Sequence, residues 1–129
     1  MIKTIGIGID IVDNNRIESL IKKKNFIDRT FSKKEIYISK KYSNKTNFFS
    51  KRFAAKESLA KALGTGFRKN LNLKDIEIAN NKLGKPYYLI NQKIKKIMKV
   101  KKNTKNFKLF LSISDEKDYS VAFTIIQKI

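Results

Sequence analysis

The chain has 129 residues, 41% of them hydrophobic, which is the usual size of one domain with enough apolar material for a core. It contains no cysteine and no histidine, which excludes disulfides, thiolate or imidazole metal sites, and catalysis by either side chain. The net charge of +19 predicts an acidic partner, either nucleic acid or protein, or else reflects lysine used as surface filler.

The N-terminal segment predicts a strand over residues 4–12, with four isoleucines on one face and Gly6, Gly8 and Asp10 on the other. The apolar stretch 5–12 contains an aspartate and is far too short to span a bilayer. Because no signal-peptide pattern surrounds it, we expect a cytoplasmic protein without a membrane partner.

Three short helices are expected next. Asp13 or Asn14 caps a helix that runs to about residue 24, and a short helical segment covers 26–30. Ser32 and Glu35 have the spacing of a capping box, which opens a third helix to about residue 42. Residues 43–48 are polar and are expected to form a loop.

The second half begins with the strongest helix signal of the chain, residues 49–63, which Gly64 ends as a C-cap. The expected elements after it are strands 75–79 and 86–90 joined by a hairpin turn, a helix capped by Asn91, and strands 107–113 and 119–127. Together these elements predict an α+β fold with a mostly antiparallel sheet packed against a long helix. We expect residues 1–129 to form a single domain.

Asp10 is the first candidate for chemistry. Its nearest neighbours on the same strand face, Gly6 and Gly8, have no side chain, and glycine in a strand often marks the close approach of a ligand or of another backbone. One interpretation is that the space beside Asp10 is open ground, without side chains, and that its carboxylate holds a cation there against a bound phosphate. The alternative is an aspartate that ends the strand and caps the next helix, with the glycines at a tight sheet contact.

Glu57 and Lys61 are four residues apart on the long helix and therefore share a face. They are either an ordinary surface ion pair or a partly buried carboxylate suited to a metal with a lysine beside it. Two weaker signals follow: Gly64-Thr65-Gly66 would present backbone N–H groups to a phosphate or simply cap the helix, and Leu83-Gly84-Lys85-Pro86 is a turn that would place a lysine beside an anion.

Taken together, GIGIDIV (6–12), RFAAKESLAKALGTG (52–66) and LGKP (83–86) resemble the holo-acyl-carrier-protein synthases, the small single-domain 4′-phosphopantetheinyl transferases. The similarity covers nearly the whole chain, and the ending FLSISDEKDYSVAFTII (110–126) also fits. The resemblance implies the 4′-phosphopantetheinyl transferase fold. It implies transfer of the phosphopantetheine of coenzyme A to a serine of apo-acyl carrier protein, with release of adenosine 3′,5′-bisphosphate, in support of fatty acid biosynthesis.

The resemblance also implies the site. Asp10 and Glu57 would bind Mg²⁺, Lys61 would stabilise the leaving group, and Glu57, directly or through a metal-bound water, would accept the serine proton. Residues implied to line the coenzyme A site are Arg52, Lys61, Gly64, Thr65, Gly66, Lys82, Gly84, Lys85 and Pro86. Residues implied to dock the acidic carrier protein are Arg16, Leu20, Phe26 and Arg29, although Leu20 and Phe26 fit core packing equally well.

Members of this family are usually homotrimers with sites between neighbouring subunits, which the resemblance extends to this chain. Some relatives carry a histidine after the SIS strand, where this chain has Asp115, so a mechanism that requires histidine is excluded. We expect Asp115 to cap the polar turn 115–118.

Two other functions would also fit parts of the sequence. A basic RNA-binding protein of ribosomal type would explain the charge, with Tyr87 and Tyr88 beside Lys85 as its local hint, but it leaves Asp10 and Glu57 unexplained. A carrier-protein-binding module without turnover would keep the fold but not need the intact Asp10, Glu57 and Lys61. We therefore expect an enzyme that does not bind nucleic acid.

Overall fold

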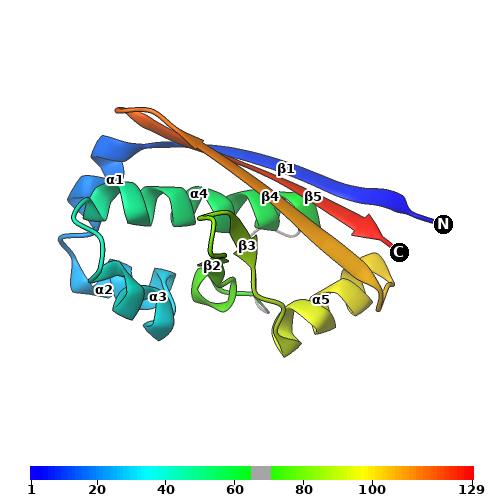
Figure 1. The fold of residues 1–129 in the computed structure, drawn as a ribbon. Helices are drawn as coiled ribbons and strands as arrows, with labels where there is room; N and C mark the ends of the chain where they lie inside the picture. The colour runs from blue at the N-terminus through cyan, green and yellow to red at the C-terminus, as the bar shows by residue number, and fades with distance from the viewer. Residues whose placement is uncertain (65–70) are drawn as a thin grey trace.

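Helix α4 (Lys45–Leu63) lies at the centre of the fold in the computed structural model, which describes residues 1–64 and 71–129. A three-stranded sheet covers one side of α4, and short helices with a small hairpin cover the other (Figure 1). Because neighbours surround it, most of α4 is buried, including the apolar Ala54, Ala55 and Leu59 at its middle. The predicted α+β fold with an antiparallel sheet against a long helix is confirmed.

The sheet consists of β1 (Lys3–Asp13), β4 (Phe107–Asp115) and β5 (Tyr119–Lys128), in the order β1-β5-β4 with antiparallel pairing throughout. The sequence predicts all three strands within two residues of their ends. Asp10 pairs with Ala122 on the central strand, and the register shifts once, between Thr4 and Gly6.

Three short helices connect β1 to α4: α1 (Asn14–Leu20), α2 (Lys24–Thr30) and α3 (Lys33–Ser39). Asp13 caps α1, and the predicted capping box of Ser32 and Glu35 opens α3. Both α1 and α3 end earlier than the sequence predicts, at Leu20 and Ser39.

The expected loop at residues 43–48 is right for residues 43 and 44 and wrong for the rest, because α4 already begins at Lys45. The side chain of Asn44 accepts a hydrogen bond from the backbone N–H of Asn47 and caps the helix there. The first turn of α4 is polar and gives no helical periodicity, which is why the sequence pattern misses it. At the other end, Gly64 adopts the left-handed conformation (φ 77°) and ends the helix as predicted.

The segment after α4 contains a short 3₁₀ turn, η1 (Leu73–Asp75), the hairpin strands β2 (Ile78–Asn80) and β3 (Pro86–Tyr88), and α5 (Gln92–Lys102), which Asn91 caps as predicted. The hairpin strands are shorter than predicted. The first begins at residue 78 instead of 75, because Asp75 closes the 3₁₀ turn, where its carboxylate accepts a hydrogen bond from the backbone N–H of Asn72.

The sheet face that points away from α4 is apolar. Ile7, Ile9 and Ile11 of β1 are 63%, 59% and 64% exposed, and Phe123 of β5, the pairing partner of Ile9, lies beside them. No described element covers this face in Figure 1. A contiguous apolar face of this kind is unusual on a monomeric protein and marks a contact surface. No helix within residues 1–64 and 71–129 is long and apolar enough to cross a membrane.

Candidate active site

The glycines of β1 allow the strand to lie directly on the backbone of α4. A Cβ atom on Gly8 would clash with the carbonyl oxygen of Ser58 and lie 2.6 Å from the N of Ala62. A Cβ on Gly6 would clash with the carbonyl oxygen of Ala62. The space beside Asp10 is therefore filled by α4, so the interpretation as open ground is wrong. The alternative is right about a tight contact, which the glycines make with α4, but Asp10 neither ends the strand nor caps α1, because β1 continues to Asp13 and Asp13 is the cap. The contact places Asp10 against the helix that carries Glu57.

Asp10 and Lys61 form an ion pair across this contact. The Nζ atom of Lys61 lies 3.0 Å from Oδ1 of Asp10, whose side chain is only 14% exposed, whereas that of Lys61 is 56% exposed. The sequence pairs Lys61 with Glu57, its neighbour one helical turn away. In the structure the lysine reaches instead to the strand, because the glycine contact brings Asp10 within reach of the helix.

Glu57 is half-buried, and burial raises the pKa of its carboxyl above the usual range. The negative charge of Asp10 raises this pKa further, while the positive charges of Lys61 and Arg16 lower it. The four side chains therefore lie close enough to act on one another. The structure brings together the two predicted metal ligands and the predicted lysine.

The donor set fits a hard cation. Asp10 and Glu57 supply carboxylate oxygens whose mutual repulsion a cation relieves, and Mg²⁺ prefers one or two carboxylates together with substrate phosphates. No group of three or more His, Cys, Asp or Glu side chains gathers in the described part of the chain. An ion at Asp10 and Glu57 would thus take its remaining ligands from substrate or water.

A second group of predicted residues lines a hollow of about 150 Å³, which we call the donor hollow. Its lining comes from α3–α4, the hairpin and β4: Tyr42, Phe48, Lys51, Arg52, Ile78, Asn80, Gly84, Pro86, Ile113 and Asp115. Of the predicted coenzyme A residues it contains Arg52, Gly84 and Pro86. Lys82 and Lys85 are exposed on the adjoining hairpin turn. The predictions for Thr65 and Gly66 fall outside the described residues, and Gly64 is the exposed end of α4.

Arg52 is the buried cation of the donor hollow, with 5% exposure. Its guanidinium lies 3.9 Å from the ring centroid of Phe48 and donates from Nη2 to Oδ1 of Asn80 at 2.9 Å. Burial lowers the pKa of Arg52, and the carboxylate of Glu35 opposes that shift. Sequence reasoning missed Asn80 and Lys51. The only signal for Asn80 was its place at the hairpin turn, which is ordinary turn chemistry.

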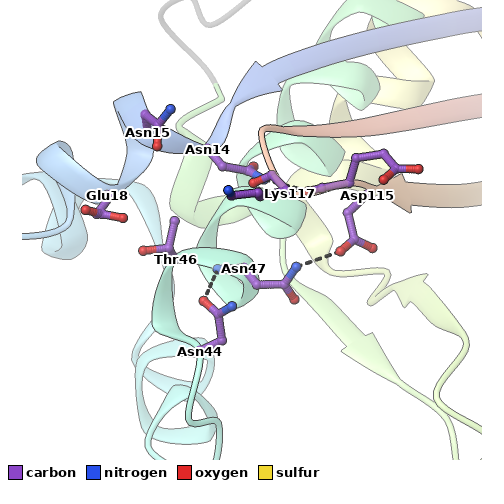
Figure 2. A pocket seen from close by; sticks show the side chains of 9 residues that line it. Asn14, Asn15, Glu18, Asn44, Thr46, Asn47, Asp115 and Lys117 are labelled. Carbon is purple, nitrogen blue, oxygen red and sulfur yellow. Dashed lines mark hydrogen bonds between the residues drawn. The ribbon is translucent and has the colours of Figure 1, made fainter.

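A larger polar hollow of about 510 Å³ borders α1, the start of α4 and the β4–β5 turn. Figure 2 shows the side chains that line it. Asp115 lines both hollows. Its carboxylate accepts a hydrogen bond from the side chain of Asn47 at 2.7 Å, whereas the turn is closed by the N–H of Glu116, which donates to Tyr119 O. The expectation that Asp115 caps the turn is therefore wrong, because its side chain points to α4.

The turn 115–118 is tied to the start of α1 by Asn14. The side-chain amide of Asn14 donates to the carbonyl oxygens of Glu116 and Lys117, both at 3.0 Å, and accepts from the hydroxyl of Ser120 at 2.8 Å. Asn14 is 7% exposed, and these bonds use its polar atoms fully. They fix α1, the predicted docking helix, to the sheet that carries Asp10.

The predicted docking residues divide into surface and core. Arg16 and Arg29 are exposed, and Arg16 lies over the ring of Phe53, while Leu20 is half-buried at the end of α1. Phe26 is only 6% exposed, because its ring packs against Phe31 and Phe53. Phe26 is thus a core residue, and we leave it out of the docking surface.

The local hint of RNA binding is also corrected. Tyr87 is exposed, but Tyr88 is 6% exposed and donates from its hydroxyl to the carbonyl oxygen of Ala55 at 2.6 Å. Its ring is therefore unavailable for stacking on a base.

Comparison with known proteins gives the family of the chain. Residues 6–124 match the family model described as "4'-phosphopantetheinyl transferase superfamily". The chain is 58% identical over 126 residues to a holo-[acyl-carrier-protein] synthase of Pelagibacter ubique, with 98% of each chain covered. It is 41% identical over 122 residues to the Fusobacterium nucleatum protein of the same name, with 95% of this chain and 98% of the other covered.

Solved structures show the same fold. The crystal structure of holo-[acyl-carrier-protein] synthase from Neisseria meningitidis has a TM-score of 0.86 and 34% identity, and the match covers 96% of this chain and 98% of the other. That of the synthase from Bacillus anthracis "in complex with CoA (3',5'-ADP)" has a TM-score of 0.81 and 34% identity, with 98% of each chain covered. Sequence, family model and fold agree: the chain belongs to the 4′-phosphopantetheinyl transferase superfamily, on its holo-[acyl-carrier-protein] synthase branch.

Proposed function

We propose that this protein transfers the 4′-phosphopantetheine of coenzyme A to a serine of apo-acyl carrier protein. The products are holo-acyl carrier protein, which serves fatty acid biosynthesis, and adenosine 3′,5′-bisphosphate. The observation that carries the proposal is the meeting of Asp10, Glu57 and Lys61 where β1 lies on α4. A cytoplasmic location is part of the proposal.

The reaction is a phosphoryl-type transfer. The serine oxygen forms a bond to the phosphorus that carries the pantetheine arm, and the bond from that phosphorus to the bridging oxygen breaks. The electron pair of the broken bond leaves with adenosine 3′,5′-bisphosphate, and the serine proton passes to a base. Such a reaction needs positioning of the two reactants and charge stabilisation more than covalent chemistry.

Glu57 is the proposed base. The raised pKa of its carboxyl makes it a better proton acceptor than an exposed glutamate, while the positive charges of Lys61 and Arg16 keep the ionised form accessible. Asp10 lies on the facing strand and adds a second negative charge beside Glu57. The chain has no histidine, so the acid–base work falls to carboxylates or water.

Asp10 and Glu57 are the proposed ligands of Mg²⁺. When bound there, the ion neutralises charge on the pyrophosphate as its bond breaks. Lys61 is the proposed partner of the same phosphates: its ammonium is more than half exposed and would move from Asp10 to the pyrophosphate once substrate binds. In that position it stabilises the charge that develops on the leaving group.

The donor hollow is the proposed binding site for the nucleotide part of coenzyme A. Arg52 and Lys51 supply positive charge there, and Gly84 and Pro86 form the wall on the hairpin side. Lys82 and Lys85 extend the positive charge along the exposed turn. Thr65 and Gly66 stay in the proposed site as predictions from sequence alone.

The proposed docking surface for the carrier protein is α1 with the end of α2. Arg16 and Arg29 are exposed there and would pair with acidic side chains of the partner, with Leu20 as a half-buried apolar contact. Arg16 also acts on the Glu57 carboxyl, so docking takes place beside the reacting atoms. A carrier-protein serine would thereby be presented to Glu57.

A homotrimer is the proposed assembly. Its support is the uncovered apolar sheet face, on which Ile9 pairs with Phe123 across β1 and β5. Copies that bury this face would remove large apolar side chains from water. Light scattering on the purified protein should give three times the chain mass, and Ile9→Lys should shift it toward the monomer. A monomeric mass for the unchanged protein would contradict the assembly.

The reaction itself is tested by product release. The protein incubated with coenzyme A, Mg²⁺ and apo-acyl carrier protein should release adenosine 3′,5′-bisphosphate, which chromatography quantifies. Chelation of the metal should abolish the release, and added Mg²⁺ should restore it. An absence of release at every salt and metal concentration would contradict the proposed function.

A further inference from the structure

Glu35 is a fully buried carboxylate that joins three elements. Its Oε1 accepts from the backbone N–H of Ser32 at 3.0 Å and from Nζ of Lys56 at 2.6 Å. Its Oε2 accepts from the N–H of Ile78 at 3.2 Å and lies 3.6 Å from Nε of Arg52. One side chain of α3 thus contacts two cations of α4 and the first strand of the hairpin.

Lys56 and Arg52 differ in how many of their hydrogen-bond donors have a partner. Lys56 is fully buried, and its three donors have three partners: Glu35 and the carbonyl oxygens of Leu73 and Ile76. That arrangement suits a structural role, because it fixes the segment around η1 to α4. Burial lowers the pKa of Lys56, while Glu35 counteracts the shift.

Arg52 is bonded less completely than Lys56. Its Nε is buried without a hydrogen-bond partner, and Nη2 donates to Asn80. Since Glu35 already neutralises Lys56 at shorter range, the charge of Arg52 is only partly balanced. A partly balanced buried guanidinium at the wall of a hollow favours an anionic ligand in that hollow.

Three neighbours determine how the guanidinium points. Glu35 lies at its Nε edge, the ring of Phe48 covers one face, and Asn80 takes Nη2. The amide of Asn80 also donates to the carbonyl oxygen of Gly84 at 2.9 Å. Asn80 therefore connects the guanidinium to Gly84 in the hairpin turn, which also lines the donor hollow.

We propose that Glu35 and Asn80 are positioning residues for the donor nucleotide, and that both act by holding the guanidinium of Arg52 at the wall of the donor hollow. The inference rests on the proposed function, which supplies an anionic nucleotide as the ligand. Neither residue is near Asp10, Glu57 or Lys61 in the contacts of the described chain. Both are therefore expected to affect binding of the donor and not the transfer step.

The test is a double-mutant cycle on binding of adenosine 3′,5′-bisphosphate, measured by calorimetry. The proteins are the unchanged chain, Asn80→Ala, Arg52→Lys and the double variant. Asn80→Ala alone should weaken binding about tenfold, as expected for the loss of a hydrogen bond to a charged group. In the Arg52→Lys background the same change should cost less than about twofold, because the group through which Asn80 acts is gone.

Additive losses in the cycle, or undiminished affinity of Asn80→Ala, would overturn the proposal. Asn80 is exposed, so its replacement is compatible with folding. In steady-state kinetics Asn80→Ala should raise KM for coenzyme A about tenfold and leave kcat and KM for carrier protein within about twofold. A fall in kcat with KM for coenzyme A unchanged would contradict a positioning role.

Glu35→Gln is the direct variant of the other residue, and it should weaken nucleotide binding at least as much as Asn80→Ala. It leaves two buried cations without their anion and is therefore expected to lower stability as well. Ser32→Ala is the matched control, because it removes only the hydroxyl that caps α3 and leaves the contact with Arg52 intact. Equal nucleotide affinity for Glu35→Gln and Ser32→Ala would overturn the role of Glu35, and if Glu35→Gln does not fold, the Asn80 cycle alone decides the proposal.

The two proposals fail in different ways. If the unchanged protein binds adenosine 3′,5′-bisphosphate but transfers nothing to carrier protein, the proposed function is wrong and the binding cycle still tests the positioning role. If the unchanged protein transfers phosphopantetheine but the cycle is additive, only the positioning role is wrong. If it does not bind the nucleotide at all, the positioning role is overturned, because no donor anion would face Arg52.

Discussion

Nζ of Lys61 lies 3.0 Å from Oδ1 of Asp10, although the two residues are 51 positions apart in the chain. The pair closes the contact between β1 and α4 one helical turn from Glu57. The positive charge of Lys61 offsets the negative charge of Asp10, which would otherwise repel the carboxylate of Glu57. The lysine therefore supports the two acids before substrate arrives, and it is free to contact phosphates afterwards.

Replacing Lys61 by Met should lower kcat about 100-fold, because a charge aimed at the leaving group is lost. The charge of Lys61 lowers the pKa of Glu57, so its removal should raise that pKa further. Since Glu57 accepts a proton only when ionised, activity is lost as the pH falls through its pKa. The acid limb of the pH–rate profile should therefore move to higher pH in Lys61→Met.

The exposed Lys99 of α5 offers a matched control. Lys99→Met removes the same charge far along the chain from Glu57 and should leave both the rate and the acid limb unchanged. An acid limb at the same pH in Lys61→Met and the unchanged protein would show that Glu57 is not the group that titrates.

Replacing Arg16 by Glu should raise KM for carrier protein about tenfold or more and leave KM for coenzyme A nearly unchanged. The reason is that Arg16 is exposed on α1, away from the donor hollow. Steady-state kinetics with each substrate varied in turn separates the two constants. A KM for carrier protein that does not change would remove α1 from the docking surface.

Replacing Gly8 by Ala should destabilise the protein by about 1–3 kcal/mol, because the added methyl group meets the backbone of α4. Since backbone cannot move aside as a side chain does, β1 and Asp10 should shift away from Glu57, and activity should fall about 100-fold. Chemical denaturation and kinetics on the same sample measure both effects. Thr4→Ala, at an exposed position of the same strand, should change neither.

Replacing Tyr88 by Phe should destabilise the fold by about 1–3 kcal/mol at neutral pH, because it removes a buried hydroxyl bonded to Ala55 O and to Thr124. Burial raises the pKa of Tyr88 to about 12. A raised folded-state pKa gives stability that is present below the unfolded value of about 10 and is lost as the pH rises through about 12.

The difference in free energy of unfolding between the unchanged protein and Tyr88→Phe should therefore be constant at neutral pH and shrink between about pH 10 and pH 12. The Phe variant is the control for all other groups, since both proteins share the same lysines. A difference that stays constant across this range would contradict a buried, hydrogen-bonded hydroxyl at Tyr88.

The sequence predicts most elements because their signals are local. The alternation of isoleucines indicates β1, and the Ser32–Glu35 spacing indicates the start of α3. The first turn of α4 escapes prediction, since its cap, Asn44, precedes polar residues that show no helical periodicity. The neighbours of Asp10 are equally hidden: only the folded chain shows that the glycines face helix backbone and not a ligand.

The site is predictable in part for the same reason. Asp10, Glu57 and Lys61 are each visible in a local pattern or in the family resemblance, but the pairing of Lys61 with Asp10 depends on how the strand crosses the helix. The network of Glu35, Arg52 and Asn80 joins α3, α4 and β2, so no spacing along the chain reveals it. Glu35 reads from sequence as a helix cap, which describes only one of its bonds.

The intact mass of apo-acyl carrier protein after incubation with coenzyme A, Mg²⁺ and each of three proteins tests the central claim most directly. The unchanged chain should add the mass of one phosphopantetheine to the carrier protein. Asp10→Asn and Glu57→Gln, each shown to be folded by circular dichroism, should add it at least about 100-fold more slowly. No added mass with the unchanged chain, or full rates with both variants, would contradict a transfer site at Asp10 and Glu57.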